Sequence, residues 1–300
     1  MMVPNNFESF PTPTTTSSVA PIPTVIPIAP HIQEIHATGE RTLWVVTVLM
    51  GISSLAFYSL GSTKPLSKRV YHTLSALITT ISFITYLALA TGQGRDWLWF
   101  DIVTKHKHVP NVTDQVVREI LWLRYVNWAL STPLLLTNFA LISGLPGAHL
   151  FSAIVSNWVM LAAGIFGSYA GHTPARWAWL TLACIAYLTT LHHAGFHAQR
   201  AAQGKDALLT RFFGAFSGSA FVVFALFPIT LAAGPLALKL SPDVETVLFA
   251  IQDIFTQGLL GYWLILSHDN AQGSTLHVDG FWSHGIGNEG AIRIHDEEGA

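Results

Sequence analysis

The chain has 300 residues, of which 51% are hydrophobic and only 11% are charged. A soluble domain carries about a quarter charged residues, so this composition excludes an ordinary soluble protein and indicates an integral protein surrounded by membrane lipid. The formal net charge of −2 gives no sign of a nucleic-acid partner, and we expect none. The single cysteine, Cys184, excludes an internal disulfide.

Residues 1–40 are rich in Pro, Thr and Ser, as in the stretch FPTPTTTSSVAPIPTVIPIAP. A segment of this composition cannot bury enough apolar surface to offset the entropy that it loses on ordering. We therefore predict a disordered tail over residues 1–40, followed by a membrane domain that starts at residue 41.

Seven apolar stretches follow, each close to the length of about 20 residues that a membrane-crossing helix needs. The expected spans are 42–63, 70–94, one that ends near 142, 150–171, 177–199, 212–234 and 244–267. No Asp, Glu, Lys or Arg occurs between Arg124 and Arg176, and the Gly- and Pro-containing stretch SGLPGAH (143–149) divides this region into two helices. Because helices satisfy their own backbone groups in lipid, the sequence predicts an all-α bundle of seven transmembrane helices over residues 41–267.

The loops and the second tail carry the remaining signals. Lys and Arg occur in loops on both sides of the predicted bundle, so charge does not settle its orientation. Asn111 begins the sequon NVT before the third span, and it is a glycosylation candidate if that loop faces outward. Residues 268–300, rich in Gly, His and Asp, are predicted to form a flexible tail and are a candidate surface for protein partners.

Histidines cluster in two parts of the chain. In the tail, the spacing of His277, His284 and His295 is irregular, which favours a solvated segment. At the end of the fifth span, His193 and His197 are four residues apart, so they share a helix face and can share a metal ion. Interfacial histidines without a metal are the commoner case, so we predict no metal site.

Two predicted spans carry polar groups, which are costly in a bilayer and tend to face the interior of a helix bundle. The third span has Arg124, Asn127, Thr132 and Asn138, and the seventh has Asp253 and Gln257. Because a lone buried charge is unfavourable, we expect Arg124 and Asp253 to pair or to share a water cluster. The residues alone leave a packing role and a role in transport or binding equally open.

The stretch RYVNWALSTPLLLTN (124–138) resembles the third helix of microbial rhodopsins. FALFPITL (224–231) is similar to the sixth helix of that family, VETVLFAIQDIF (244–255) to the seventh, and GFWSHGIGNEGAIRI (280–294) to the tail of fungal opsin-related proteins. The resemblance spans residues 40–267 and implies a microbial rhodopsin-like fold, with the N-terminus extracellular and the C-terminus cytoplasmic. It also implies a pocket lined by Tyr86, Trp128, Thr132, Met160, Gly164, Trp179, Phe224, Phe227 and Leu231.

Several positions depart from that family. A lysine one turn after the seventh-helix aspartate forms a Schiff base with retinal in the family, and Gln257 stands there in this chain. An amide nitrogen is not nucleophilic enough to condense with an aldehyde. The positions of the proton acceptor and the proton donor carry Asn127 and Asn138. The resemblance, with these departures, implies no cofactor and no covalently bound retinal, and it implies a retained polar network of Arg124, Asn127, Asn138, Glu245 and Asp253.

With these departures the chain resembles the fungal heat-shock-type membrane opsin homologues, and this resemblance implies a non-photoactive opsin-related protein of the plasma membrane with a stress-linked, chaperone-like or regulatory role. No nucleophile–base arrangement, phosphate loop or nucleotide motif occurs in the sequence, so we expect no enzymatic activity. A first alternative is a receptor or carrier that binds an apolar ligand noncovalently in the former retinal pocket. A second alternative is a photoreceptor or an ion-transporting rhodopsin. The sequence leaves homo-oligomerisation open.

Overall fold

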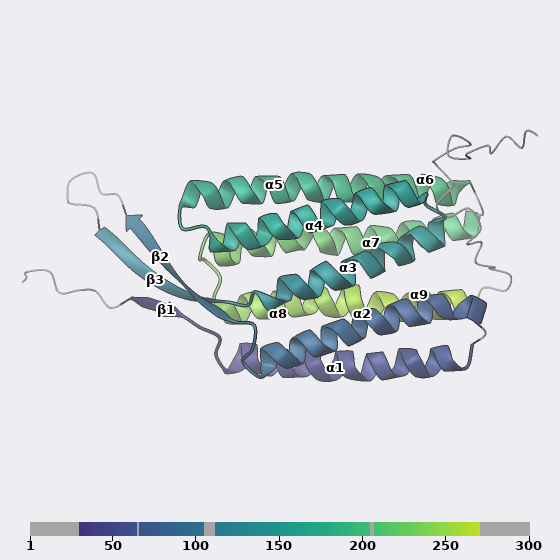
Figure 1. The fold of residues 1–300 in the computed structure, drawn as a ribbon, viewed down its shortest axis with the longest axis horizontal. Coiled ribbons are helices and arrows are strands. Elements are labelled where there is room, and N and C mark those ends of the chain that lie inside the picture. The colour runs from purple at the N-terminus through teal and green to yellow at the C-terminus, as the bar shows by residue number, and fades with distance from the viewer. Residues whose placement is uncertain (1–29, 65, 105–111, 205–206, 271–300) are drawn as a thin grey trace, which may run out of the picture.

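The computed structural model describes residues 30–64, 66–104, 112–204 and 207–270, and these form seven helical rods with a small sheet at one end (Figure 1). Four rods contain a single helix, namely α1 (Ala37–Ser62), α2 (Leu66–Ala90), α3 (Leu123–Ser143) and α4 (Gly147–Tyr169). The other rods are α5 (Thr173–Leu191) with α6 (Ala198–Gln203), α7 (Ala207–Leu231), and α8 (Pro242–Asp253) with α9 (Leu260–Asn270). The predicted bundle of seven helices is therefore confirmed.

Three rods contain a turn of π-helix, in which one extra residue widens the helix. These turns are η1 (His192–His197) between α5 and α6, η2 (Ala232–Leu236) after α7, and η3 (Ile254–Leu259) between α8 and α9. Single π-turns within α-helices frequently occur at functional sites. Here η3 carries Gln257 and η1 carries three of the chain's histidines.

Six of the described helices are long and apolar enough to cross a membrane. They are Ala37–Ser62, Arg69–Ala90, Leu123–Ser143, Gly147–Tyr169, Ala207–Leu236 and Pro242–Ser267. The remaining rod of the seven starts with α5. It is less apolar because it includes Arg176 and the histidines of η1. Leu55 and Val222 point outward, whereas Asn127 and Asp253 are fully buried, which is the distribution of a protein that faces lipid.

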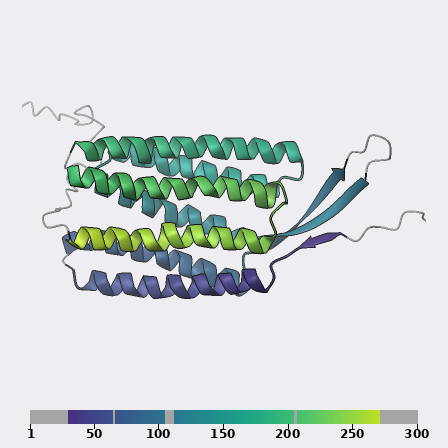
Figure 2. The same ribbon diagram turned by 180° about the vertical axis from the view of Figure 1, so that it is seen from behind.

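The rods form two layers (Figure 2). In this view α5, α7, the α8–α9 rod and α1 follow one another across the near face, and α4, α3 and α2 lie behind them. The polar residues of α3 and of the α8–α9 rod therefore meet inside the bundle. This arrangement brings together residues more than a hundred positions apart in the sequence.

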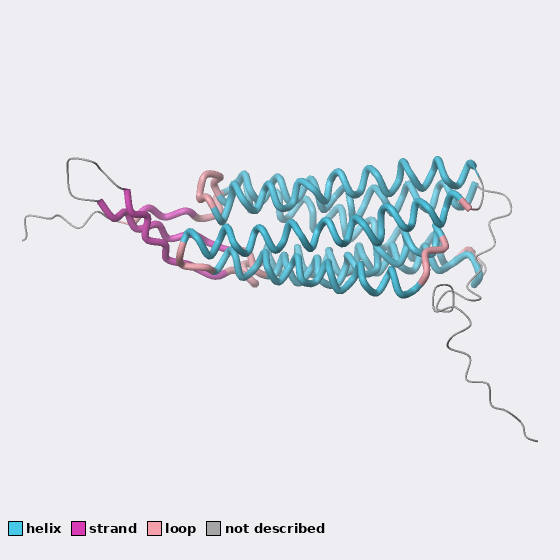
Figure 3. Tube along the Cα trace, turned by 90° about the horizontal axis from the view of Figure 1, so that it is seen from above, coloured by secondary structure: helices cyan, strands magenta, loops and turns pink. Residues whose placement is uncertain are grey.

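A three-stranded sheet extends from one end of the bundle (Figure 3), and the sequence analysis did not predict it. Its order is β1 (His31–Gln33), β3 (Val112–Ile120), β2 (Asp96–Thr104), with β1 parallel and β2 antiparallel to β3. The segment expected to be a disordered tail up to residue 40 thus includes a paired strand and the first turn of α1. A strand of three residues is too short to show the alternation of apolar and polar residues that identifies a strand in a sequence. Its stability comes from the partner strand.

The helix that carries most of the interior polar groups is bent by a proline and ended by a glycine. Pro133 has no N–H to donate to the carbonyl of Ala129, and the indole of Trp158 in α4 donates to that oxygen instead over 2.9 Å. Gly144 follows the helix with φ of 74°, a left-handed conformation that favours glycine. The Trp158 hydrogen bond thus joins α4 to α3 at the carbonyl that the proline leaves free.

Candidate functional site

The interior of the bundle holds four linked polar side chains, Ser82, Asn127, Asp253 and Gln257, which we name the Gln257 cluster. The side-chain oxygen of Gln257 accepts hydrogen bonds from Ser82 of α2 and from Asn127 of α3, the second over 3.2 Å. The side-chain nitrogen of Gln257 donates to Asp253 Oδ1 over 3.3 Å. All four side chains are buried, so the cluster joins α2, α3 and the α8–α9 rod through hydrogen bonds in the core.

Asp253 is a buried carboxylate whose partners are neutral donors. The hydroxyl of Tyr86 donates to its Oδ2 over 2.5 Å, and the indole nitrogen of Trp128 donates to its Oδ1 over 2.8 Å. Together with Gln257, these groups provide three donors to one carboxylate. A buried charge is tolerated when such hydrogen bonds replace its hydration. The Asp253 carboxylate can therefore be accommodated in the core without a direct ion pair.

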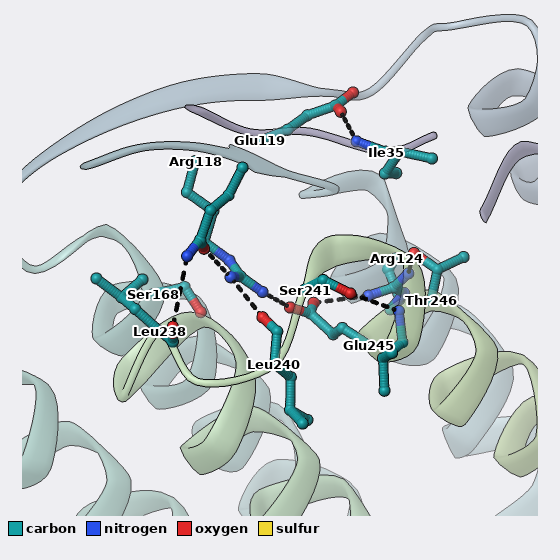
Figure 4. Close-up of polar contacts among 12 residues, drawn as sticks. Ile35, Arg118, Glu119, Arg124, Ser168, Leu238, Leu240, Ser241, Glu245 and Thr246 are labelled. Atoms are coloured by element: carbon teal, nitrogen blue, oxygen red, sulfur yellow. Dashed lines mark hydrogen bonds and ion pairs between the residues drawn. The ribbon is translucent and has the colours of Figure 1, made fainter. Parts of the chain in front are cut away.

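A second polar group, the Arg–Glu–Arg cluster, lies where the sheet meets the bundle (Figure 4). Glu245 in the first turn of α8 forms ion pairs with Arg118 of β3 and with Arg124 of α3, the second over 3.1 Å. Arg124 also donates to Thr246 over 3.4 Å. Arg118 donates to the Leu240 carbonyl over 2.8 Å, so the cluster joins the sheet to two helices.

Arg124 and Asp253 were expected to pair or to share a water cluster, and the structure does not have the direct pair. Arg124 lies in the first turn of α3 and pairs with Glu245 in the first turn of α8, because both helices start at the sheet end of the bundle. Asp253 lies eight residues further along, which is a rise of about 12 Å in a helix. Four residues of the predicted polar network are therefore divided between the Gln257 cluster (Asn127 and Asp253) and the Arg–Glu–Arg cluster (Arg124 and Glu245).

A cavity of about 50 Å³ lies beside the Gln257 cluster, between α3, α4, α5, α7 and the α8–α9 rod. Its walls include residues that the sequence analysis assigned to the pocket, namely Trp128, Thr132, Met160, Gly164, Phe224, Phe227 and Leu231, and Gln257 also lines it. Phe227 stacks on Phe249 with ring centroids 5.8 Å apart and meets Trp128 edge-on at 4.7 Å. Most of the cavity wall is apolar, and its polar lining residues are Ser131, Thr132, Asn157, Thr256 and Gln257.

Three of the predicted site residues lie elsewhere. Tyr86 is buried but faces Asp253 from α2, away from the cavity. Trp179 of α5 packs outside the cavity on Phe166, with ring centroids 5.2 Å apart. Asn138 lies deeper in α3 and belongs to neither polar cluster, and its side-chain oxygen has no hydrogen-bond partner among the described residues.

Arg118 was not predicted from the sequence as a site residue. Arg118 is fully buried, although it stands in a loop region by sequence. The stretch VVREI could have indicated a buried strand that contains Arg118, because a charged pair interrupts residues typical of such a strand. Asn111 and the tail histidines His277, His284 and His295 lie outside the described residues.

Comparison with known proteins finds a matching family model and several similar proteins. A family model described as Bacteriorhodopsin-like protein matches residues 38–270. Opsin-1 of Neurospora crassa is 37% identical over 292 residues, which cover 96% of this chain and 96% of the relative. The Opsin-like protein carO of Fusarium fujikuroi is 29% identical over 236 residues, which cover 79% of this chain and 75% of the relative.

The solved structures agree. The crystal structure of the light-driven proton pump LR (Mac) from Leptosphaeria maculans is similar with a TM-score of 0.78 and 36% sequence identity. The match covers 80% of this chain and 98% of that one. The light-driven proton pump of Coccomyxa subellipsoidea is similar with a TM-score of 0.70 and 25% identity, covering 79% of this chain and 100% of that chain.

These relatives correct two expectations from the sequence. The expected non-photoactive protein with a stress-linked, chaperone-like or regulatory role is contradicted, because the matching proteins are opsins and light-driven proton pumps. The expectation of no cofactor is contradicted as well, because Bacteriorhodopsin-like proteins and the light-driven pumps normally bind retinal. Since the family model covers all seven helical rods and Opsin-1 matches over nearly the whole length, the chain belongs to the Bacteriorhodopsin-like family, the microbial rhodopsins.

Proposed function

We propose that this chain is a rhodopsin-class membrane protein that takes retinal into the cavity beside the Gln257 cluster. The observation that carries the proposal is the aromatic-walled cavity inside the bundle, which Gln257 lines together with a few other polar side chains. Ligand pockets are mostly apolar with a few polar groups that set orientation, and this lining has that character. The cavity, at about 50 Å³, has room for only a few water molecules, so rings such as Phe227 must turn aside for a polyene to enter.

We further propose that Gln257 occupies the position of the family's retinal-binding lysine. A carboxamide forms no Schiff base, so covalent attachment of retinal does not fit the residue present. Among lysines whose side chains are described, Lys64 follows α1 and Lys239 precedes α8, both in connections at the ends of the bundle. In this proposal retinal is therefore held by shape and hydrogen bonding.

The residues at the polar end of the cavity have a definite binding role in this proposal. Gln257 has both a donor and an acceptor in one side chain, and Asn127 donates to its oxygen without lining the cavity itself. Gln257 can donate a hydrogen bond to the terminal oxygen of a retinoid if its present partner, Asp253, is released. Trp128 and Phe227 exclude water from the apolar part of the ligand.

A retinal titration tests this proposal. All-trans retinal added to the purified protein in detergent is expected to quench tryptophan fluorescence saturably, and borohydride is expected to leave no retinoid bonded to the chain. The double variant Gln257→Lys with Asn127→Asp is expected to form a visible pigment that borohydride fixes, because it has both an amine and a carboxylate beside it. Gln257→Leu is the matched control without an amine.

Two results would overturn the proposal in separate ways. Absence of saturable binding by the wild type, together with absence of pigment in the double variant, would show that the cavity takes no retinal. A borohydride-fixed pigment in the wild type would instead show that the assignment of Gln257 is wrong.

Proton movement across the membrane is the second candidate function, because the similar protein from Leptosphaeria maculans is a light-driven proton pump. The structural support is the presence of two buried polar clusters, one with Gln257 and Asp253 and one with Arg124 and Glu245. Retinal-loaded proteoliposomes would then show a light-dependent pH change that Asp253→Asn abolishes. A flux equal to that of protein-free vesicles removes this candidate and leaves retinal binding to be judged by the titration.

We also propose the setting in which the protein works. The described chain starts at the sheet end of the bundle and ends at the opposite end, which supports placing its two termini on opposite sides of the membrane (Figure 1). The proposed arrangement has the N-terminus outside the cell, the plasma membrane as location, and protein partners bound through residues 268–300. The family resemblance supports this orientation and the absence of enzymatic activity.

A further inference from the structure

Four histidines gather at the end of the bundle opposite the sheet. His149 is the third residue of α4, and His192, His193 and His197 belong to η1. The Nδ1 atoms of His149 and His193 are 2.9 Å apart, and the rings of His149 and His197 stack with centroids 4.1 Å apart. One ring nitrogen from each of His149, His193 and His197 lies within 4.8 Å of the other two.

The local fold explains why these rings meet. His193 and His197 are four residues apart and lie on one face of the rod, with ring planes only 20° from parallel. The π-turn also brings His192, five residues before His197, to an Nε2–Nε2 distance of 3.1 Å. Pro146 starts α4 beside this face, so that His149 enters the group from a second helix.

The group has the chemistry of a transition-metal site. Imidazole nitrogen suits Zn²⁺, and three histidines with one open position is a known ligand set for this ion. At Zn–N distances of about 2.0–2.1 Å, the nitrogens of a tetrahedral site lie roughly 3.3 Å apart. The separations here, 2.9 Å and up to 4.8 Å, fall on both sides of that value, so small ring rotations bring the three nitrogens into position.

We propose that His149, His193 and His197 bind one Zn²⁺ ion and thereby clamp the start of α4 to the rod that contains η1. His192 supports His197 through their contact, as partners of ligating imidazoles commonly do. The expectation of no metal, drawn from His193 and His197 alone, lacked the third ligand. That ligand comes from a helix 44 residues earlier in the chain.

Zinc titration of the purified full-length chain, prepared with a tag that contains no histidine, tests the proposal. We expect one Zn²⁺ per chain by competition with a chromophoric chelator, and a rise in the unfolding midpoint when Zn²⁺ is added. His149→Ala, His193→Ala and His197→Ala should each weaken binding by at least about 10–100-fold, since even residues around the ligands have effects of that size. Co²⁺ in place of Zn²⁺ should give the visible spectrum of a four-coordinate ion in the wild type and not in these three variants.

Two controls separate this site from other histidines. His172→Ala removes an exposed histidine at the sheet end of α5, and it should leave zinc affinity unchanged. The triple variant His277→Ala, His284→Ala and His295→Ala removes tail histidines, and it should also retain binding. Circular dichroism confirms that each variant is folded.

The proposal would be overturned by a wild-type chain that binds no Zn²⁺, or by a folded His149→Ala variant with wild-type affinity. Loss of binding in the triple tail variant alone would place the ion in the tail and would equally contradict the proposal. Because neither retinal nor the Gln257 cluster enters this measurement, its outcome is independent of the proposed function.

Discussion

Arg118 is the largest fully buried side chain among the described residues, and it carries a charge. Its guanidinium contacts Glu245, the Leu240 carbonyl and Gln33 of β1, so it joins a strand, a connection and a helix. Arg118→Ala should destabilise the protein by about 3–5 kcal/mol, because Glu245 loses one of its two cationic partners in a buried site. Thermal unfolding in detergent measures this effect.

The matched control for Arg118 is Arg41→Ala, which removes an exposed arginine from α1. Its unfolding midpoint should stay near that of the wild type, since exposed charges contribute little. Equal midpoints for the Arg118 and Arg41 variants would contradict the structural importance of the Arg–Glu–Arg cluster.

At the scale of single elements, the start of α1 depends on a residue from another helix. Asp243 Oδ1 in the first turn of α8 accepts hydrogen bonds from the backbone N–H groups of His36 and Gly39, over 2.9 and 2.8 Å. A Cβ atom at residue 39 would lie 2.6 Å from Asp243 Oδ1, so only glycine allows this approach. Asp243→Ala should therefore cost about 1 kcal/mol, as loss of a helix cap does, and should speed amide exchange at the start of α1.

Two further variants identify the cause of that effect. Asp243→Asn keeps an acceptor oxygen and should retain most of the stability. Glu40→Ala removes an exposed acid in the first turn of α1, which should cost only a few tenths of a kcal/mol through the helix dipole. If Glu40→Ala destabilised α1 as much as Asp243→Ala, general charge rather than the specific cap would be responsible.

Elements differed in how far the sequence could predict them. The helices were predictable within several residues, because each apolar run ends at charged or helix-breaking residues such as Lys64 and Pro146. The π-turns were not, since one extra residue in a long apolar helix changes no composition. The cavity walls followed from the family resemblance, whereas the Arg124–Glu245 pair depends on how α3 and α8 are aligned, which no single stretch of sequence encodes.

At the scale of the whole molecule, the proposed orientation gives a labelling prediction. Gln115 is exposed on the sheet and Gln203 is exposed at the opposite end of the bundle. In a Cys184→Ala background, a membrane-impermeant maleimide should label Gln115→Cys in intact cells and Gln203→Cys only after permeabilisation. The reverse pattern would show that the N-terminus faces the cytoplasm.

The sheet has a mechanical consequence. Because β1 lies between the amino-terminal segment and α1, tension on that segment must first shear the three residue pairs between β1 and β3. It must also part Gln33 from Arg118 before any load reaches the first helix. A fusion partner or cell-wall contact that pulls on the start of the chain therefore acts on the Arg–Glu–Arg cluster, and through Arg124 on the third helix.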